Sequence, residues 1–359
     1  MTLATRSLRA GGREVPLLAG PGALKEVRRA LRDAGFEGRL FVVADERALA
    51  LHGDALADVL ADAPTLAISG DESAKTLEGV SRVWDWLVEH NAQRRDALVA
   101  FGGGVVCDMV GFAAASYLRG VGLVNVPTTL LAQVDASVGG KTGVNHPRGK
   151  NLIGAFYQPL CVVADTSLLR SLPRREFAAG MAEVAKIGMI LDRDLFVTLE
   201  RVAATLEPAA AAALAPIVAR AIEIKADIVE RDELESGERM FLNYGHTIGH
   251  ALEAGAGYGT LLHGEAVAIG MQAAALISHG IGLLDEPSAQ RQTDLLTALG
   301  LPLRSPIPSE EVLKRLVHDK KRAGARQRWV LAERVGAGQI RDDVPTEIVF
   351  EAVSSITST

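Results

Sequence analysis

Cysteine is scarce in this sequence, and no export signal is visible. Only Cys107 and Cys161 occur among 359 residues, and they do not form a Cys-x-x-Cys spacing. Secreted proteins that depend on disulfides carry many more cysteines in shorter chains, so a disulfide framework is excluded. No apolar run follows Met1, so we expect no signal peptide. We therefore predict a cytoplasmic location, where thiols stay reduced.

The chain also lacks a long apolar run and an excess of positive charge. A membrane helix needs about 20 continuous apolar residues. The longest apolar region, residues 98–134, is interrupted by Asp108, Arg119 and several glycines. The formal net charge is −6 at pH 7, which excludes a general attraction to nucleic acids or anionic lipids. We expect no nucleic acid and no membrane as partner, and an anionic ligand would need cations concentrated in a pocket.

The remaining composition is that of a globular protein whose first half alternates between strands and helices. Hydrophobic residues make up 48% and charged residues 23%, and the length suggests roughly two domains. Strands are expected at 39–45, 65–69, 97–101 and 122–127, with helical segments at 56–60 and 76–90. This α/β alternation predicts a parallel, doubly wound sheet that binds ligands at the carboxyl ends of its strands.

Helical periodicity dominates after residue 168. Helices are expected at 174–190, 192–202, 208–233, 241–254, 264–281, 288–299 and 309–320, with a short strand at 328–331. No internal repeat is evident. We therefore predict an α/β domain at 1–168 and a mainly α-helical domain at 169–359.

Two glycine-rich turns are candidates for phosphate contacts. Residues 102–108, Gly-Gly-Gly-Val-Val-Cys-Asp, connect a predicted strand to a helical segment, and glycines let a backbone approach a pyrophosphate. Their spacing differs from Gly-x-Gly-x-x-Gly, and tight packing alone explains such a turn equally well. Residues 139–143, Gly-Gly-Lys-Thr-Gly, lack the spacing of a phosphate loop, so nucleotide hydrolysis is rejected.

Several side chains have the chemistry of metal ligands. His246 and His250 are four residues apart and share one face of a predicted helix, His263 follows, and Glu183 lies in an apolar helix. A catalytic zinc usually has three protein ligands and an open position. Histidines with this spacing are more often core or capping residues, but a carboxylate inside an apolar helix favours a metal, because an unpaired buried charge is costly.

Cations near predicted turns form a third group, although each one alone is more often a solvated surface charge. They are Arg119, Lys141, Lys150, Lys186, Lys225, Arg239, Lys320 and Lys321.

Taken in order, these segments resemble the 3-dehydroquinate synthase family over almost the whole chain. The resemblance is carried by residues 126–146, 149–159, 180–186, 242–250, 263–267 and 318–321. It implies a Rossmann-like dinucleotide-binding N-terminal domain, a helical C-terminal domain, NAD, and one zinc or cobalt ion held by Glu183, His246 and His263. His250 would then contact a metal ligand or the substrate, which differs from what helix spacing alone suggests.

The resemblance also implies the residues that contact NAD and substrate. The NAD contacts are expected from Asp45, Gly70, Asp71, Glu72, Ser73, Ala74, Lys75, Gly104, Val105, Val106, Cys107, Asp108, Thr128, Thr129, Lys141, Lys150, Leu168, Leu169, Arg170 and Ser171. The catalytic and substrate contacts are expected from Arg119, Asp135, Lys141, Asn151, Lys186, Lys225, Arg239, Asn243, His250 and Lys321.

The reaction implied is the conversion of 3-deoxy-arabino-heptulosonate 7-phosphate to 3-dehydroquinate and phosphate in the shikimate pathway. The family oxidises the substrate transiently with NAD, eliminates phosphate, returns the hydride and closes the ring by an intramolecular aldol step. An anionic sugar acid phosphate explains the many cations, because arginine and lysine bind carboxylates and phosphates. The resemblance further suggests a homodimer.

This chain departs from the family pattern at a few positions, and three alternatives stay open. Cys107 stands where the family usually has glycine, and Tyr244 and Ile248 replace leucine and phenylalanine. A sister cyclase, such as an aminodehydroquinate synthase, has nearly the same pattern. A metal-dependent alcohol or glycerol dehydrogenase would release NADH and would not need so many cations. A non-catalytic protein on the same fold would lose its metal ligands.

Overall fold

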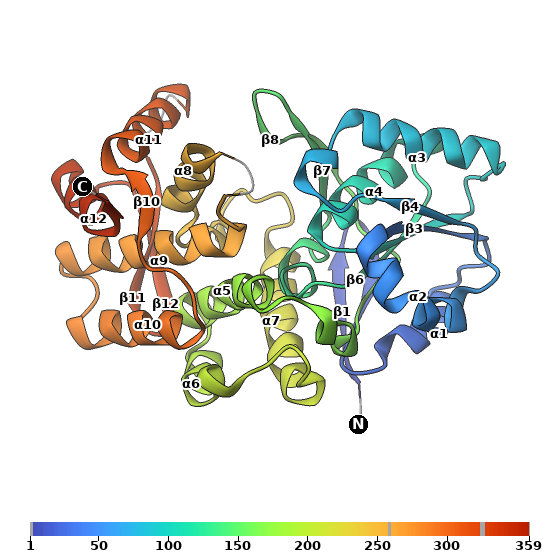
Figure 1. The fold of residues 1–359 in the computed structure, drawn as a ribbon, viewed down its shortest axis with the longest axis horizontal. Helices are drawn as coiled ribbons and strands as arrows, with labels where there is room; N and C mark the ends of the chain where they lie inside the picture. The colour runs from blue at the N-terminus through green and yellow to red at the C-terminus, as the bar shows by residue number, and fades with distance from the viewer. Residues whose placement is uncertain (1–2, 258–259, 324–326, 359) are drawn as a thin grey trace. The chain divides into compact units, whose positions relative to one another are not determined.

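The computed structural model describes residues 3–257, 260–323 and 327–358, and the side chains of residues 317–323 and of Ser358 lie outside this description. Two compact units result, Met1–Pro173 with Glu207–Leu234, and Arg174–Leu206 with Glu235–Thr359 (Figure 1). This division differs from a single boundary at 168, because residues 207–234 belong to the first unit.

The helix responsible for that difference is α7 (Ala211–Arg231). Its buried residues include Leu214, Val218 and Ile222, and it packs against strand β1 (Ala4–Ala10). Arg6 of β1 also donates to Asp227 on α7. Periodicity predicts that a helix forms, but it does not say against which sheet the apolar face packs.

The first unit is built on a seven-stranded sheet. Its strand order is β1 (Ala4–Ala10), β2 (Arg13–Ala19), β9 (Cys161–Ala164), β6 (Gly122–Pro127), β5 (Ala97–Gly102), β3 (Leu40–Asp45) and β4 (Thr65–Ile68). Only β1 is antiparallel to its neighbour, and the other pairs are parallel. The predicted Rossmann-like parallel sheet is therefore confirmed.

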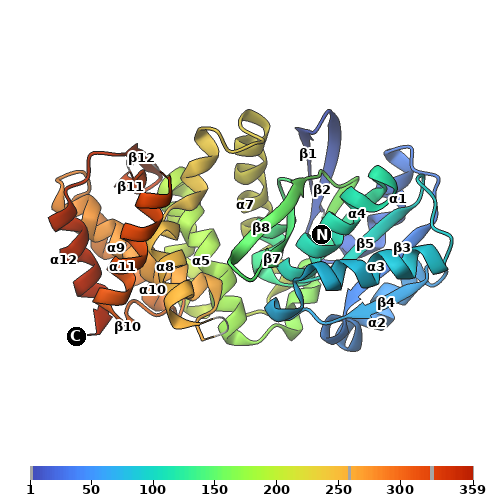
Figure 2. The ribbon, with the colours of Figure 1, turned by 90° about the horizontal axis from the view of Figure 1, so that it is seen from above.

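Helices cover both faces of this sheet, as strand alternation requires (Figure 2). Val42 and Ala44 of β3 pack with α1 (Val27–Asp33) and α2 (Glu46–Leu60). Phe41 and Val43 of the same strand face α3 (Leu77–Glu89) and α4 (Gly104–Ser116). A hairpin of β7 (Lys141–His146) and β8 (Gly149–Phe156) lies beside α4.

The chain changes direction at β3. Strand β4 pairs with one side of β3 and β5 pairs with the other side, which makes a topological switch point. Asp45 ends β3, Gly102 ends β5 and Thr128 follows β6, so all three lie at the carboxyl edge of the sheet. This is the edge where ligands of such sheets bind.

The second unit is mainly helical. It contains α5 (Arg174–Leu191), α6 (Arg193–Val202), α8 (His246–Ala256), α9 (His263–Gly280), α10 (Glu286–Ala298), α11 (Ser309–Ala323) and α12 (Thr346–Ile356). Two small ribbons join β11 (Trp329–Arg334) to β12 (Ala337–Arg341) and β10 (Ser305–Pro308) to β13 (Thr357–Ser358). Helix α9 runs through the middle of this unit and contacts α5, α8, α10 and α12 (Figure 1).

Short single-turn segments connect these elements. They are η1 (Ala23–Glu26), η2 (Glu72–Ala74), η3 (Tyr117–Arg119), the π-helical η4 (Ala132–Ala136), η5 (Thr166–Ser171), η6 (Ala203–Thr205) and η7 (Glu238–Asn243). The helix expected at 241–254 is split, because Gly245 has φ +78° and α8 begins only at His246. Among the described residues no helix has the length and apolarity to span a membrane.

Candidate metal centre and cofactor edge

Three predicted metal ligands converge within the second unit. Glu183 lies in the middle of α5 and is fully buried, His246 begins α8, and His263 begins α9. Their ligand atoms all lie within 4.8 Å of one another. Two imidazoles and one carboxylate suit zinc or cobalt, which both accept nitrogen and oxygen ligands.

Glycines allow the three helices to approach so closely. A Cβ atom at Gly264, beside His263, would lie 1.9 Å from the Ala179 carbonyl oxygen of α5. A Cβ atom at Gly270 would lie 2.0 Å from the carbonyl oxygen of Gly245, beside His246. The backbone of α9 therefore lies in direct contact with the backbone segments that carry the other two candidate ligands. Any residue larger than glycine at these two positions would prevent this contact.

Hydrogen bonds orient both histidine rings. His246 Nδ1 lies 3.1 Å from the Tyr244 carbonyl oxygen, and His263 Nδ1 lies 3.0 Å from Glu253 Oε2. Both partners accept hydrogen bonds, so each Nδ1 carries a proton. The Nε2 atoms lie 3.7 Å (His246) and 3.5 Å (His263) from Glu183 Oε1. Each Nε2 therefore faces the carboxylate, as in histidines that bind metals.

Burial and neighbouring charges shift the pKa values of all three candidate ligands. Burial alone would raise the pKa of the Glu183 carboxyl, but the charges of Lys186 and His246 lower that pKa well below its ordinary value. Burial and Lys186 lower the pKa of His246 to about 3. For His263, burial lowers the pKa, but the nearby Glu183 and Glu253 carboxylates raise it to about 10.

The Glu183 carboxylate is well suited to a cation. It forms an ion pair with the buried Lys186 ammonium, yet neither of its oxygens accepts a hydrogen bond of regular geometry within the described part of the chain. Such buried acceptors are rare in proteins unless an unseen group satisfies them. The donor set and these two oxygens therefore fit a divalent metal ion.

His250 and Glu253 form a second grouping with His263. The His250 ring lies 5.3 Å from the His246 ring and 6.1 Å from the His263 ring, but His250 is exposed. Since Glu253 already binds His263 Nδ1, the buried Glu183 set is the better metal centre. The carboxylate of Glu253 was not predicted, although its place one helical turn after His250 offers a signal.

Other predicted substrate residues of the second unit lie on the segments around this centre. Arg239 is buried in η7, and the Asn243 side chain donates to Glu235 Oε1 at 2.9 Å. The side chains of Lys320 and Lys321 lie outside the described part of α11.

The first unit gathers the predicted cofactor residues at the carboxyl edge of its sheet. Asp45 Oδ1 accepts from the amides of Arg47 and Ala48 and so caps α2. Gly70, which follows β4, lies so close to Asp45 that a Cβ atom at Gly70 would be 1.6 Å from Asp45 Oδ2. Helix α4 starts after Gly103 without a side-chain cap, which leaves its first amides for an anion.

A polar network surrounds this turn. Lys75 Nζ lies 2.5 Å from both Asp108 Oδ2 and Asn151 Oδ1. Burial raises the pKa of the Asp108 carboxyl, an effect that the Lys75 charge opposes but does not cancel. Lys225 of α7 pairs with Asp135 in η4. Lys225 therefore belongs to the first unit and not to the helical one.

Other predicted cofactor residues also lie at the carboxyl edge of the sheet, whereas the predicted substrate residue Arg119 does not. Thr128 and Thr129 follow β6, and residues 168–171 form η5 after β9, where His52 of α2 contacts Ser171 Oγ at 2.7 Å. Arg119, in contrast, precedes β6 and so lies at the amino edge of the sheet. A strand of six residues separates the two edges by roughly 20 Å. The substrate contact of Arg119 stays a prediction.

Cys107 is buried in α4, and burial raises the pKa of its thiol. Tyr244 is fully buried, its hydroxyl donates to Gln292 Oε1 at 2.7 Å, and its carbonyl holds His246. The contact with His246 comes from the backbone of residue 244 and does not depend on the side chain, whereas the tyrosine hydroxyl itself is bonded to Gln292.

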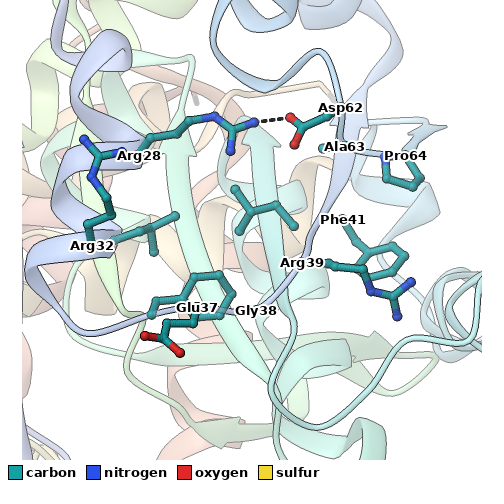
Figure 3. A pocket seen from close by; sticks show the side chains of 12 residues that line it. Arg28, Arg32, Glu37, Gly38, Arg39, Phe41, Asp62, Ala63 and Pro64 are labelled. Carbon is teal, nitrogen blue, oxygen red and sulfur yellow. Dashed lines mark hydrogen bonds and ion pairs between the residues drawn. The ribbon is translucent and has the colours of Figure 1, made fainter.

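A cavity of about 400 Å³ lies elsewhere in the first unit (Figure 3). Its lining includes the start of β3 and the segment that precedes β4, so the cavity lies at the amino edge of the sheet. Its arginines Arg28 and Arg39 are paired with Asp62 and Asp96. This cavity is therefore separate from the cofactor edge.

Comparisons with known proteins agree with this arrangement. The 3-dehydroquinate synthase N-terminal and C-terminal family models match residues 65–179 and 180–322. A 3-dehydroquinate synthase from Shewanella halifaxensis is 47% identical over 320 residues, which are 88% of this chain and 89% of that protein.

Solved structures of related cyclases share the whole fold. A 2-epi-5-epi-valiolone synthase from Streptomyces hygroscopicus, with NAD+ and Zn2+ bound, is 30% identical with a TM-score of 0.88, covering 98% of this chain and 99% of that one. A 2-deoxy-scyllo-inosose synthase complexed with carbaglucose-6-phosphate, NAD+ and Co2+ is 29% identical with a TM-score of 0.86, covering 98% and 100%. With both family models matched in order and this identity to a curated relative, the chain belongs to the 3-dehydroquinate synthase family.

Proposed function

We propose that this chain converts 3-deoxy-arabino-heptulosonate 7-phosphate to 3-dehydroquinate and phosphate, with NAD and one divalent zinc or cobalt ion. Family membership supports the reaction, and the related cyclases named above contain NAD+ with Zn2+ or Co2+. The observation that carries the proposal is the buried Glu183 carboxylate facing two histidine Nε2 atoms.

The two bound groups divide between the two units. Glu183, His246 and His263 would hold the metal, while Asp45, the 70–75 segment and the turn at 102–108 would hold NAD. When bound, the metal supplies a Lewis acid for a substrate hydroxyl and NAD supplies a reversible hydride acceptor.

The chain's own side chains bind and orient the substrate. The buried Arg239 guanidinium suits a carboxylate, because its planar fork donates two parallel hydrogen bonds. Lys186 places an ammonium beside the metal ligands, where it favours the deprotonated form of a nearby hydroxyl. Lys225, Lys141 and Lys150 add positive charge for phosphate groups. Binding that fixes a flexible acid phosphate in one geometry promotes the intramolecular steps.

The alternatives differ in what the chain should release or accept. The two sister cyclases named above are only 29–30% identical to this chain, and the chain retains Arg239 and the Gly139–Gly143 turn. An aminodehydroquinate synthase remains the nearest alternative. A dehydrogenase would accumulate NADH. A cyclase would not, because it returns the hydride to its substrate and regenerates NAD in each turnover.

We also propose a homodimer, from the family resemblance, and a cytoplasmic location, which suits two buried cysteines that form no disulfide. Light scattering coupled to gel filtration tests the dimer, and a mass of one chain at micromolar concentration contradicts it.

One assay tests the proposed reaction. The zinc-loaded protein, catalytic NAD and the heptulosonate phosphate are mixed, and phosphate and carbocyclic product are followed together. We expect one phosphate per dehydroquinate and no net NADH. Turnover with the amino analogue alone would favour the sister enzyme, and NADH accumulation with simple alcohols would favour the dehydrogenase.

A further inference from the structure

Asn145 in β7 is hydrogen-bonded both to the 72–75 segment and to Asn151 in β8. Its side-chain amide donates to Glu72 Oε1 at 2.7 Å, and its Oδ1 accepts from the backbone amide of Asn151 at 3.0 Å. Its own backbone amide donates to the Lys75 carbonyl oxygen at 2.9 Å. Both halves of the amide side chain and the backbone are therefore engaged.

These bonds close a ring with Lys75. The Lys75 ammonium contacts Asn151 Oδ1 at 2.5 Å and Asp108 Oδ2 at 2.5 Å. Asn151 has φ +55°, a left-handed conformation that asparagine adopts more readily than most other residues with a side chain. The hydrogen bond from the Asn151 N–H to Asn145 Oδ1 holds the backbone at this position.

We propose that Asn145 is a positioning residue that locks the 72–75 segment to the β7–β8 hairpin, so that Glu72 and Lys75 face the dinucleotide in fixed positions and Asn151 stays bonded to Lys75. The ligand's identity rests on the proposed function. Asn145 itself need not touch NAD or substrate.

The chemistry explains why an amide occupies this position. The side chain must donate to a carboxylate on one side and accept from an amide on the other. Aspartate keeps the acceptor for Asn151 but loses the donor, and it places a second negative charge against Glu72. Lys150 Nζ lies 4.0 Å from the same Glu72 oxygen, which does not replace the lost donor.

This reasoning leads to a charge-swap experiment with Asn145→Asp, Glu72→Gln and the double variant. In the double variant the glutamine amide donates to the aspartate, and the aspartate still accepts from Asn151. NAD binding to the zinc-loaded full chain is measured by calorimetry. Leu152→Ala, an exposed hairpin residue, serves as the control.

We expect Asn145→Asp to weaken NAD binding about tenfold or more, because a hydrogen bond to a charged group is lost and like charges meet. The double variant should bind NAD about as well as Glu72→Gln alone, and Leu152→Ala should match the wild type. A double variant whose loss equals the product of the two single losses overturns the proposal.

Two further readouts separate this role from a structural one and from a failure of the proposed function. The ligand-free melting temperature of Asn145→Asp should stay near that of the wild type while KM for NAD rises. If Asn145→Asp does not fold, a double variant that folds and binds NAD supports the lock, and one that is equally unfolded overturns it. A wild type that does not bind NAD removes the proposed function and the inference together, whereas normal wild-type binding without coupling removes the inference alone.

Discussion

At the scale of single residues, the hydrogen bond from His263 Nδ1 to Glu253 decides which ring nitrogen faces Glu183. Glu253 is buried, and its carboxylate has no role in binding the metal directly if Glu183 is the ligand. Carboxylates in this position usually orient a histidine and increase its basicity.

We therefore expect Glu253→Ala to lower the affinity for Zn²⁺ about 10- to 100-fold, which competition with a chromogenic chelator measures. The loss arises because His263 can then rotate and exchange its tautomer. Glu351→Ala, on the exposed face of α12, is the control and should bind zinc as the wild type does. An unchanged affinity in a folded Glu253→Ala protein would show that the helices alone orient His263.

At the scale of helices, the approach of α9 to α5 depends on the missing side chain at Gly264. We expect Gly264→Ala to destabilise the second unit by about 1–3 kcal/mol and to weaken zinc binding, because the new methyl group meets a backbone carbonyl that cannot move aside. Thermal unfolding and the same chelator competition measure both effects.

Gly255→Ala in α8 is the matched control. A Cβ atom there would meet its nearest neighbours at 3.4–3.5 Å, which is ordinary contact, so a helical alanine is tolerated. If both alanine variants retain wild-type stability and zinc affinity, close helix approach is not what forms the metal centre.

Helices and central strands were predictable because their periodic patterns are local. The strand at 97–101 and the helix at 174–190 recur as β5 and α5 with ends shifted by at most one residue. The ribbons β1–β2 and β7–β8 were not predicted. Strands β1 and β8 are largely polar or exposed and lack a buried alternating face, whereas β2 was missed although it buries Val15, Leu17 and Leu18.

The site divides in the same way. Helix spacing favours His246 with His250, and only family resemblance selects His263, which reaches Glu183 from a different helix. Glu253 was missed although it follows His250 by one helical turn, and Asn145 was missed because an amide that orients other residues has no spacing signal of its own. The placement of α7 was missed for a similar reason, since its partner β1 lies more than 200 residues earlier.

At the scale of the whole molecule, the predicted metal ligands and the predicted NAD contacts belong to different compact units. A ligand stabilises the part of the protein that it binds in the folded state, by about 2.7 kcal/mol at 100 times Kd. We therefore expect Zn²⁺ to raise the unfolding temperature of the second unit and NAD to raise that of the first.

Differential scanning calorimetry with each ligand alone measures this prediction. Chelation of the metal should reverse the zinc effect without changing the NAD effect. A single transition that both ligands shift equally would contradict this prediction, because it would show that the two units unfold together.

The return of the chain to its first unit has a consequence during synthesis. Residues 1–173 leave the ribosome without α7, the helix whose Asp227 and Glu230 bind Arg6. The amino-terminal unit therefore cannot finish folding until residue 234 has emerged, by which time α5 and its buried Glu183 are already exposed to water. Nascent chains of intermediate length thus carry an apolar helix without its partners, the kind of exposed surface that makes incomplete chains prone to aggregation.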